Sequence, residues 1–253
     1  MPLLANLKWC SFIQTKKVMK KLLLASTSTL YGEEYLNYLL PHLKIFFNGI
    51  KKVTFIPYAM PGGISYDNYT ERAKRAFAKI DISIQGIHEG DDPLTLLNEA
   101  EGIFTGGGNT FLLVKTIYQH GLMESLRKKI FAGLPYMGTS AGSNIAGVTM
   151  QNTNDMPIVY PPSFKTLGAI PFNINAHYLD PVEGSVHMGE TRETRIKEYH
   201  VHNTVPVVGL REGSWLLVND EKIMLQGEQP ARIFIQGRSP YELSAGVEVN
   251  IEP

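Results

Sequence analysis

Five residues, Gly138 to Gly142, have the types and spacing needed to present a serine nucleophile. They read Gly-Thr-Ser-Ala-Gly and directly follow a short apolar run, Leu134 to Met137. This pattern is typical of a nucleophile elbow, in which a strand ends, the chain turns sharply and a helix begins. The two glycines remove the Cβ atoms that would clash in such a turn, and Ser140 is held out at its tip. About one chain in ten of this length contains the pattern by chance. The interpretation therefore depends on whether the rest of the chain supplies a base, an acid and an oxyanion hole.

A serine nucleophile needs a histidine base and an acid that orients this base. Among seven histidines, His177 follows the alternating segment 172–175 and is placed near a strand end, so we expect it to be the base. Asp155 and Glu212 both lie in turns and are the candidate acids, although a turn role suffices for either. The order Ser140, Asp155, His177 is that of α/β-hydrolases. We therefore take Asp155 as the first candidate for the acid and keep Glu212 as the alternative.

Three consecutive glycines, of which the last two are Gly107 and Gly108, precede Asn109 and Thr110. Glycines allow the backbone to approach a ligand closely. We therefore expect an oxyanion hole from the N–H of Gly107 or Gly108 and that of Ala141, with Asn109 and Thr110 binding substrate. The same run could cradle a phosphate. It lacks the Gly-Lys-Ser/Thr ending of a P-loop, and no Gly-x-Gly-x-x-Gly opens the first helix, which argues against nucleotide binding.

Metal-assisted hydrolysis is the rival mechanism. His200 and His202 are two residues apart and so lie on different faces of a predicted helix, and the chain has no His-Glu-x-x-His motif. We expect neither a metal nor an organic cofactor. The single cysteine, Cys10, permits no internal disulfide, and favours a reducing compartment such as the cytoplasm.

The composition is that of a globular protein. The chain has 253 residues, of which 43% are hydrophobic and 19% charged, and its formal net charge is zero. This balance gives no indication of a nucleic-acid or membrane partner, and no apolar run approaches the roughly 20 residues that span a bilayer. We expect residues 1–18 to be a flexible N-terminal extension and residues 19–253 to form a single catalytic domain.

The first half of the chain alternates short apolar runs with longer amphipathic ones, which predicts a parallel sheet covered on both faces. The predicted strands are 21–26, 52–57, 82–87 and 102–105. The predicted helices are 33–47, 66–79, 93–100, 110–119 and 122–131. Ligands gather at the carboxyl ends of strands in such sheets, and both the glycine run and the elbow fall at that edge.

The second half contains fewer helices and more turn residues. We predict a helix over 189–199 and strands over 205–210, 214–218, 222–225 and 231–236, the last of them antiparallel. There is no internal repeat or linker, so one domain is the simplest interpretation.

Eight stretches in the same order resemble the peptidase E family of α-aspartyl dipeptidases, serine peptidases that remove an N-terminal aspartate from dipeptides. The resemblance runs from Lys20 to about Phe234. The stretches are Leu22–Leu30, Phe55–Ala59, Gly106–Phe111, Ser140–Gly142, Thr153–Val159, Phe172–His177, Gly189–Arg192 and Gly209–Trp215.

The resemblance implies a class I glutamine amidotransferase-like fold, an α/β three-layer αβα sandwich with a mostly parallel sheet and antiparallel strands near the C-terminus. It implies Ser140 as nucleophile, His177 as base and either Asp155 or Glu212 as acid. It also places Arg192 near the substrate aspartate, where a guanidinium can pair a β-carboxylate bidentately. The implied partner is a small Asp-Xaa peptide. We expect the protein to be a monomer or a homodimer.

Two alternatives stay open. A related hydrolase could cleave other aspartyl bonds, as a cyanophycinase does. A small-molecule binding protein without catalytic activity could also keep the same fold.

Overall fold

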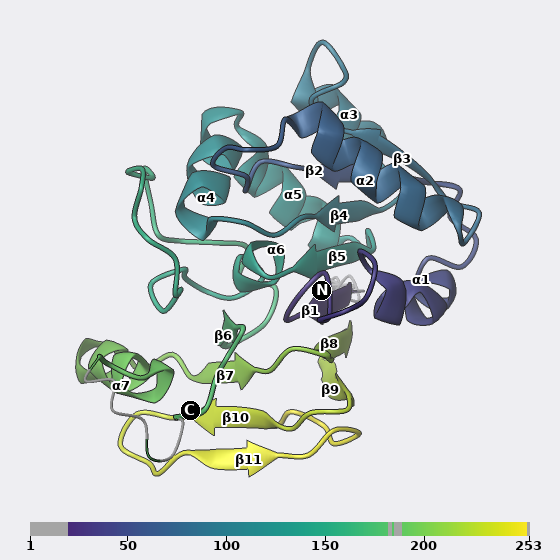
Figure 1. Cartoon of the computed structure of the whole chain (residues 1–253). Helices are drawn as coiled ribbons and strands as arrows, with labels where there is room; N and C mark the ends of the chain where they lie inside the picture. The colour runs from purple at the N-terminus through teal and green to yellow at the C-terminus, as the bar shows by residue number, and fades with distance from the viewer. Residues whose placement is uncertain (1–19, 182–183, 185–188, 252–253) are drawn as a thin grey trace, which may run out of the picture.

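A computed structural model describes residues 20–181, 184 and 189–251, which fold around a seven-stranded sheet (Figure 1). The strand order is β3-β2-β4-β5-β1-β8-β9. The first five strands are mutually parallel, whereas β8 and β9 are antiparallel to their neighbours. The strands are β1 (Lys21–Ala25), β2 (Lys52–Ile56), β3 (Ser83–Gly86), β4 (Ile103–Thr105), β5 (Tyr136–Thr139), β8 (Ser214–Asn219) and β9 (Lys222–Gly227).

Helices cover both faces of this sheet, as the alternation of apolar runs predicts. On one face, the short helix η1 and the helices α1 and α2 pack against apolar side chains of the strands. On the other face the cover is α3, α4, α5 and the short α6. The expected three-layer α/β architecture is therefore confirmed. The helices are η1 (Asn37–Leu39), α1 (Leu40–Phe46), α2 (Tyr66–Ala78), α3 (Pro93–Glu99), α4 (Thr110–Gln119), α5 (Leu122–Phe131) and α6 (Ala141–Asn144).

The second half of the chain builds a separate four-stranded sheet, which Figure 1 shows beside the first with α7 at one end. Its order is β11-β10-β7-β6, in which β6 and β7 are parallel and the other pairs antiparallel. The antiparallel strands expected near the C-terminus are thus divided between two sheets. The elements are β6 (Asn173–Ala176), α7 (Arg192–His202), β7 (Val207–Leu210), β10 (Ala231–Phe234) and β11 (Tyr241–Leu243).

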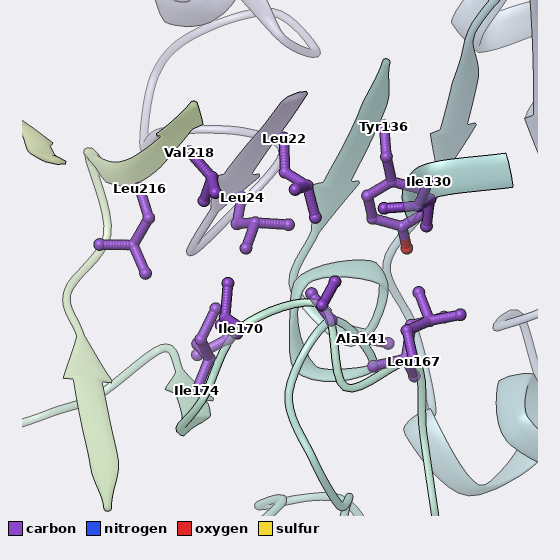
Figure 2. Close-up of a cluster of buried hydrophobic side chains, with 14 of the residues drawn as sticks. Leu22, Leu24, Ile130, Tyr136, Ala141, Leu167, Ile170, Ile174, Leu216 and Val218 are labelled. Atoms are coloured by element: carbon purple, nitrogen blue, oxygen red, sulfur yellow. The ribbon is translucent and has the colours of Figure 1, made fainter. Parts of the chain in front are cut away.

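One apolar layer joins the two sheets. Figure 2 shows Leu22 and Leu24 of β1 directed, with Leu216 of β8, towards Ile174 of β6 and Ala141 of α6. All five side chains are at most 1% exposed. Burying a side chain of the size of leucine or isoleucine stabilises a fold by roughly 1.5–3 kcal/mol. This layer therefore fixes β6, which ends directly before His177, and α6, which begins directly after Ser140.

Three helix predictions differ from the structure at their ends. The helix predicted over 33–47 begins only at Leu40, because Pro41 lies in its first turn and cannot continue a helix from upstream. The helix expected after the elbow is only four residues long, so its dipole is weak. The helix predicted over 189–199 is shifted to Arg192–His202, because the Thr191 side chain caps its first turn.

The predicted extension, residues 1–18, lies outside the described residues. Within the part of the chain that the structure does describe, no helix combines the length and apolar character needed to cross a membrane.

Candidate active site

The elbow is built as its glycines predict. Ser140 has φ 52° and ψ −112°, a conformation that side-chain-bearing residues rarely adopt. A Cβ atom on Gly142 would lie 2.2 Å from the Thr105 carbonyl oxygen, and one on Gly138 would lie 2.4 Å from the Gly142 carbonyl oxygen. Both positions therefore require glycine, because each contact is with rigid backbone.

Hydrogen bonds to β1 hold the elbow in place. The Ser140 N–H and the Ser143 hydroxyl both donate to the Ala25 carbonyl, at 3.0 and 2.7 Å. The buried Tyr136 hydroxyl donates to the Gly142 carbonyl at 2.7 Å. The serine is thus fixed by the strand beside it as well as by the turn.

His177 follows β6 and also has a positive φ, 54°. Its backbone N–H donates to the hydroxyl of the buried Ser26 at 2.9 Å, and this hydroxyl donates in turn to the Leu210 carbonyl at 2.7 Å. Ser26 therefore ties the end of β1 to the residue that carries the imidazole and to the end of β7. The sequence reasoning missed Ser26, although its place directly after a buried strand at the carboxyl edge of the sheet was a usable signal.

The three polar side chains form one hydrogen-bonded line. The Ser140 Oγ lies 2.9 Å from the His177 Nε2, and the His177 Nδ1 lies 2.6 Å from the Glu212 Oε1. Because a carboxylate only accepts, the proton of the neutral ring is on Nδ1, and Nε2 is left to accept from the serine hydroxyl. The side chains of His177 and Glu212 are 39% and 48% exposed, so solvent reaches this line.

Glu212 lies in the turn between β7 and β8, directly after a well-anchored arginine. Arg211 makes bidentate contacts with both Asp180 and Glu242, at 2.8 to 3.0 Å. These two carboxylates raise the pKa of Arg211. Asp180 is three residues beyond His177, so the same guanidinium ties together the segments that carry the base and the carboxylate.

Asp155 lies away from the imidazole. Its Oδ2 accepts from the Thr110 backbone N–H at 2.7 Å and from the Thr153 hydroxyl at 3.1 Å. The residue expected first as the acid is therefore bound to the first turn of α4, and the carboxylate that contacts His177 is the alternative, Glu212. Chain order therefore does not decide which carboxylate contacts the imidazole, because Glu212 reaches His177 from a segment that follows it in the chain.

The glycine run lies beside the serine. A Cβ atom on Gly107 would lie 3.0 Å from the Ser140 Cβ, and Gly108 has φ 138°, which only glycine adopts readily. Among the described residues, no acceptor binds the N–H of Gly107 or Gly108. The N–H of Ala141 opens α6 and has no acceptor within that helix. All three expected oxyanion donors are thus near the serine and available.

Asn109 and Thr110 have structural partners. Asn109 caps α4 by accepting from the Leu112 N–H at 3.0 Å, and its amide donates to the Met156 carbonyl at 2.8 Å. The Thr110 side chain is buried and accepts from the Asn144 amide at 3.2 Å. Both residues shape the loop at the site, and these contacts occupy their side chains.

Arg192, the first residue of α7, is half-buried. Burial and the neighbouring charge of Arg195 lower the pKa of the Arg192 guanidinium, and the negative charge of Asp155 opposes this shift. Within the described ranges it makes no ion pair, whereas Glu193 beside it binds Arg232 at 3.0 Å. The charge of Asp155 thus acts on the Arg192 guanidinium. The ion pair of Glu193 with Arg232 holds the helix on which Arg192 lies.

No metal site accompanies these groups in the part of the chain that is described, where no three His, Cys, Asp or Glu side chains are grouped to hold an ion. His200 has a structural partner, because its Nε2 donates to the Val205 carbonyl at 3.1 Å.

A serine on an elbow, hydrogen-bonded to a histidine that is itself bonded to a carboxylate, at the carboxyl edge of an α/β sheet, defines a hydrolase of the serine class. Comparison with known proteins gives the particular family. The model of peptidase family S51 matches residues 22–226, and the chain belongs to this family.

Individual relatives agree. The chain is 49% identical over 229 residues to peptidase E of Streptomyces coelicolor, covering 90% of this chain and 93% of that one. It is 43% identical over 218 residues to the Drosophila melanogaster protein named "Probable alpha-aspartyl dipeptidase", covering 85% and 90%. A crystal structure of a peptidase from an acI-B1 actinobacterium superposes with a TM-score of 0.68 at 16% identity, covering 93% and 98%. This last likeness concerns the fold.

Proposed function

We propose that this member of peptidase family S51 is a serine exopeptidase that hydrolyses dipeptides with an N-terminal aspartate. The observation that carries the proposal is the line from Ser140 through His177 to Glu212, with contacts of 2.9 and 2.6 Å. The names of its relatives, peptidase E and alpha-aspartyl dipeptidase, indicate the substrate class.

The reaction proceeds by acyl transfer. The Ser140 Oγ attacks the scissile carbonyl carbon while the His177 Nε2 takes the hydroxyl proton. His177 then passes this proton to the nitrogen of the leaving residue, the C–N bond breaks, and an aspartyl ester on Ser140 is left. Water, deprotonated by His177, hydrolyses the ester and returns the proton to the serine. The available N–H groups of Gly107 or Gly108 and of Ala141 stabilise the oxyanion at each stage.

Glu212 is the acid of this mechanism. It accepts from the His177 Nδ1 and stabilises the imidazolium that forms when the serine is deprotonated. Asp155 is assigned instead to substrate binding, since it lies in the electrostatic range of Arg192 and beside the glycine run. Its carboxylate is suited to the α-ammonium group of the substrate.

Arg192 is assigned to the β-carboxylate of the substrate aspartate. A guanidinium pairs a carboxylate bidentately, and Arg192 makes no ion pair with another described residue that would compete. We do not include the side chains of Asn109 and Thr110 among the substrate contacts, because their hydrogen bonds are already used within the fold.

The proposal needs no metal or organic cofactor, and the single cysteine agrees with work in the cytoplasm. The partner is a small peptide, and the protein acts as a monomer or a homodimer.

The deciding assay is turnover of Asp p-nitroanilide and of an Asp-Xaa dipeptide by the wild type and by Ser140→Ala. We expect the variant to lose activity, whereas the matched variant Ser239→Ala, at an exposed serine, keeps it. Full activity of Ser140→Ala would refute the serine mechanism. Equal turnover of Asp and Ala substrates would refute the specificity, and turnover of β-aspartyl peptides in preference to Asp-Xaa would favour a cyanophycinase-like activity.

A further inference from the structure

A cavity of about 220 Å³ opens in front of the serine and the histidine. Ser140, His177, Gly107 and Gly108 line it, and so does Arg72 of α2. The volume is below the roughly 300 Å³ at which pockets for drug-sized ligands begin. The cavity therefore suits a ligand as small as a dipeptide.

The charge in this cavity has one sign. Neither an aspartate nor a glutamate lines it, and its basic side chains are Arg72 and His177. On the same helix Lys74 pairs with Glu89, at 2.8 Å. Arg72 has no carboxylate within 4.0 Å among the residues that the structure describes. A guanidinium that pairs with no described carboxylate, in a cavity whose lining contains no acid, is suited to a carboxylate of the ligand.

Arg72 is also held in position. Its guanidinium lies 4.5 Å from the centre of the Tyr35 ring, a cation–π contact. Tyr35 is nearly buried and packs against Tyr69 with their ring centres 6.2 Å apart. The Tyr69 hydroxyl donates to the Gly107 carbonyl at 3.3 Å. The cation is thus connected, through two buried rings, to the backbone that adjoins the serine.

An Asp-Xaa dipeptide carries two carboxylates, one on each of its residues. The β-carboxylate belongs to the first residue, for which Arg192 is proposed, and Arg192 does not line this cavity. The C-terminal carboxylate belongs to the leaving residue. Its carbon is separated from the scissile carbon by only three bonds and lies within about 4 Å of it. In a dipeptide bound to Ser140, this carboxylate must therefore lie close to the serine.

We infer that Arg72 binds the C-terminal carboxylate of the dipeptide and thereby selects dipeptides over longer chains. In a longer peptide an uncharged amide occupies the same position, and the guanidinium is left without its ion pair. Met60 and Ile64 also line the cavity and provide an apolar wall for the side chain of the leaving residue. This inference rests on the proposed dipeptidase function.

The test compares Asp-Leu, its C-terminal amide and Asp p-nitroanilide in the wild type, Arg72→Met and Arg72→Lys. Arg75→Met is the matched control, because Arg75 is an exposed arginine on the same helix that does not line the cavity. We expect Arg72→Met to lower kcat/KM for Asp-Leu by about 10- to 100-fold, mainly through KM. Turnover of the amide and the anilide should stay within about twofold of wild type. Arg72→Lys should recover part of the loss, and Arg75→Met should behave as wild type.

Equal losses on Asp-Leu and Asp p-nitroanilide, or no loss on Asp-Leu, would overturn the inference. A second measurement separates it from the proposed function. Calorimetry of the Ser140→Ala protein should show tighter binding of Asp-Leu than of its amide, and this preference should vanish in Ser140→Ala/Arg72→Met. A wild type inactive on every aspartyl substrate would refute the function, whereas the binding preference would still support the role of Arg72. Absence of any preference in Ser140→Ala would refute that role even if the enzyme is active.

Discussion

Replacing Glu212 by glutamine separates the two candidate acids. Glutamine keeps the shape of the side chain and can still accept from the His177 Nδ1, so the change removes chiefly the negative charge. That charge acts when the imidazole becomes a cation. With charge centres about 4 Å apart, the attraction is about 4 kcal/mol at an effective dielectric constant of 20 and about 1 kcal/mol in water.

The two side chains are 39% and 48% exposed, which places the effect between these limits. A loss of about 2–3 kcal/mol in the transition state lowers kcat about 10²-fold, since each 1.36 kcal/mol is a factor of ten. Binding of the substrate does not involve this charge, so KM should change little.

The assay is the steady-state turnover of Asp p-nitroanilide by Glu212→Gln and by Asp155→Asn, with thermal melting of both to show that they fold. Asp155→Asn should keep kcat within about threefold and raise KM, because its proposed role is in binding. The opposite result, a large fall of kcat in Asp155→Asn with Glu212→Gln near wild type, would refute the reasoning from the 2.6 Å contact.

Three further predictions concern the frame of the site. Ser26→Ala removes the hydroxyl that binds the His177 N–H, which should destabilise the fold by about 1–3 kcal/mol and lower kcat, as melting and turnover would record. Gly142→Ala forces a Cβ to 2.2 Å from the Thr105 carbonyl oxygen, so the melting temperature should fall by at least about 2–4 °C for each kcal/mol of strain. Hydrogen bonds from Arg211 lower the pKa values of its two carboxylate partners from 3.8 and 4.5. The stabilisation of the folded state by these two ion pairs is therefore complete above pH 4.5, and it is lost as the pH falls through the pKa values that the carboxyls have in the folded protein. Arg211→Met should thus melt at a lower temperature than wild type at pH 7, and the difference between the two melting temperatures should become smaller in acid.

Matched variants control each of these experiments. Thr166→Val removes another buried hydroxyl, which donates to the Gly147 carbonyl at 2.7 Å, and should leave kcat unchanged. Gly62→Ala adds a Cβ where nothing lies within 4 Å, and should melt as wild type does. Arg238→Met removes an exposed arginine and should not alter the dependence of melting on pH. If a control variant shows as large a change in kcat or melting temperature as the variant it is matched to, the contact that we assign to that variant does not cause the change.

The layered fold could be predicted because its signals are local. Apolar runs bounded by turns gave the strands and helices of the first half nearly to the residue, with α4 and α5 at the predicted bounds. The start of α1 was wrong because Pro41 was passed over inside an otherwise helical pattern. The division of the second half into two sheets could not be read from the chain, since strand pairing depends on contacts between distant segments.

The site shows the same limit. The serine and the glycine run carry their own local signature, whereas the carboxylate that contacts His177 has none. Glu212 and Asp155 are both turn residues in sequence, and only the packing of β6 against β7 brings Glu212 to His177. Ser26 was missed for a similar reason, because its two partners are 151 and 184 residues away.

The backbone of Ser140 has a consequence for how this protein can be made more robust. A non-glycine residue at φ 52° and ψ −112° costs of order 1–3 kcal/mol, and Ser140→Gly would relieve much of it. The substitution that best suits the turn is thus one that ends catalysis. Stability and activity are opposed at this single position, so a search that ranks variants by melting temperature alone would select against the nucleophile.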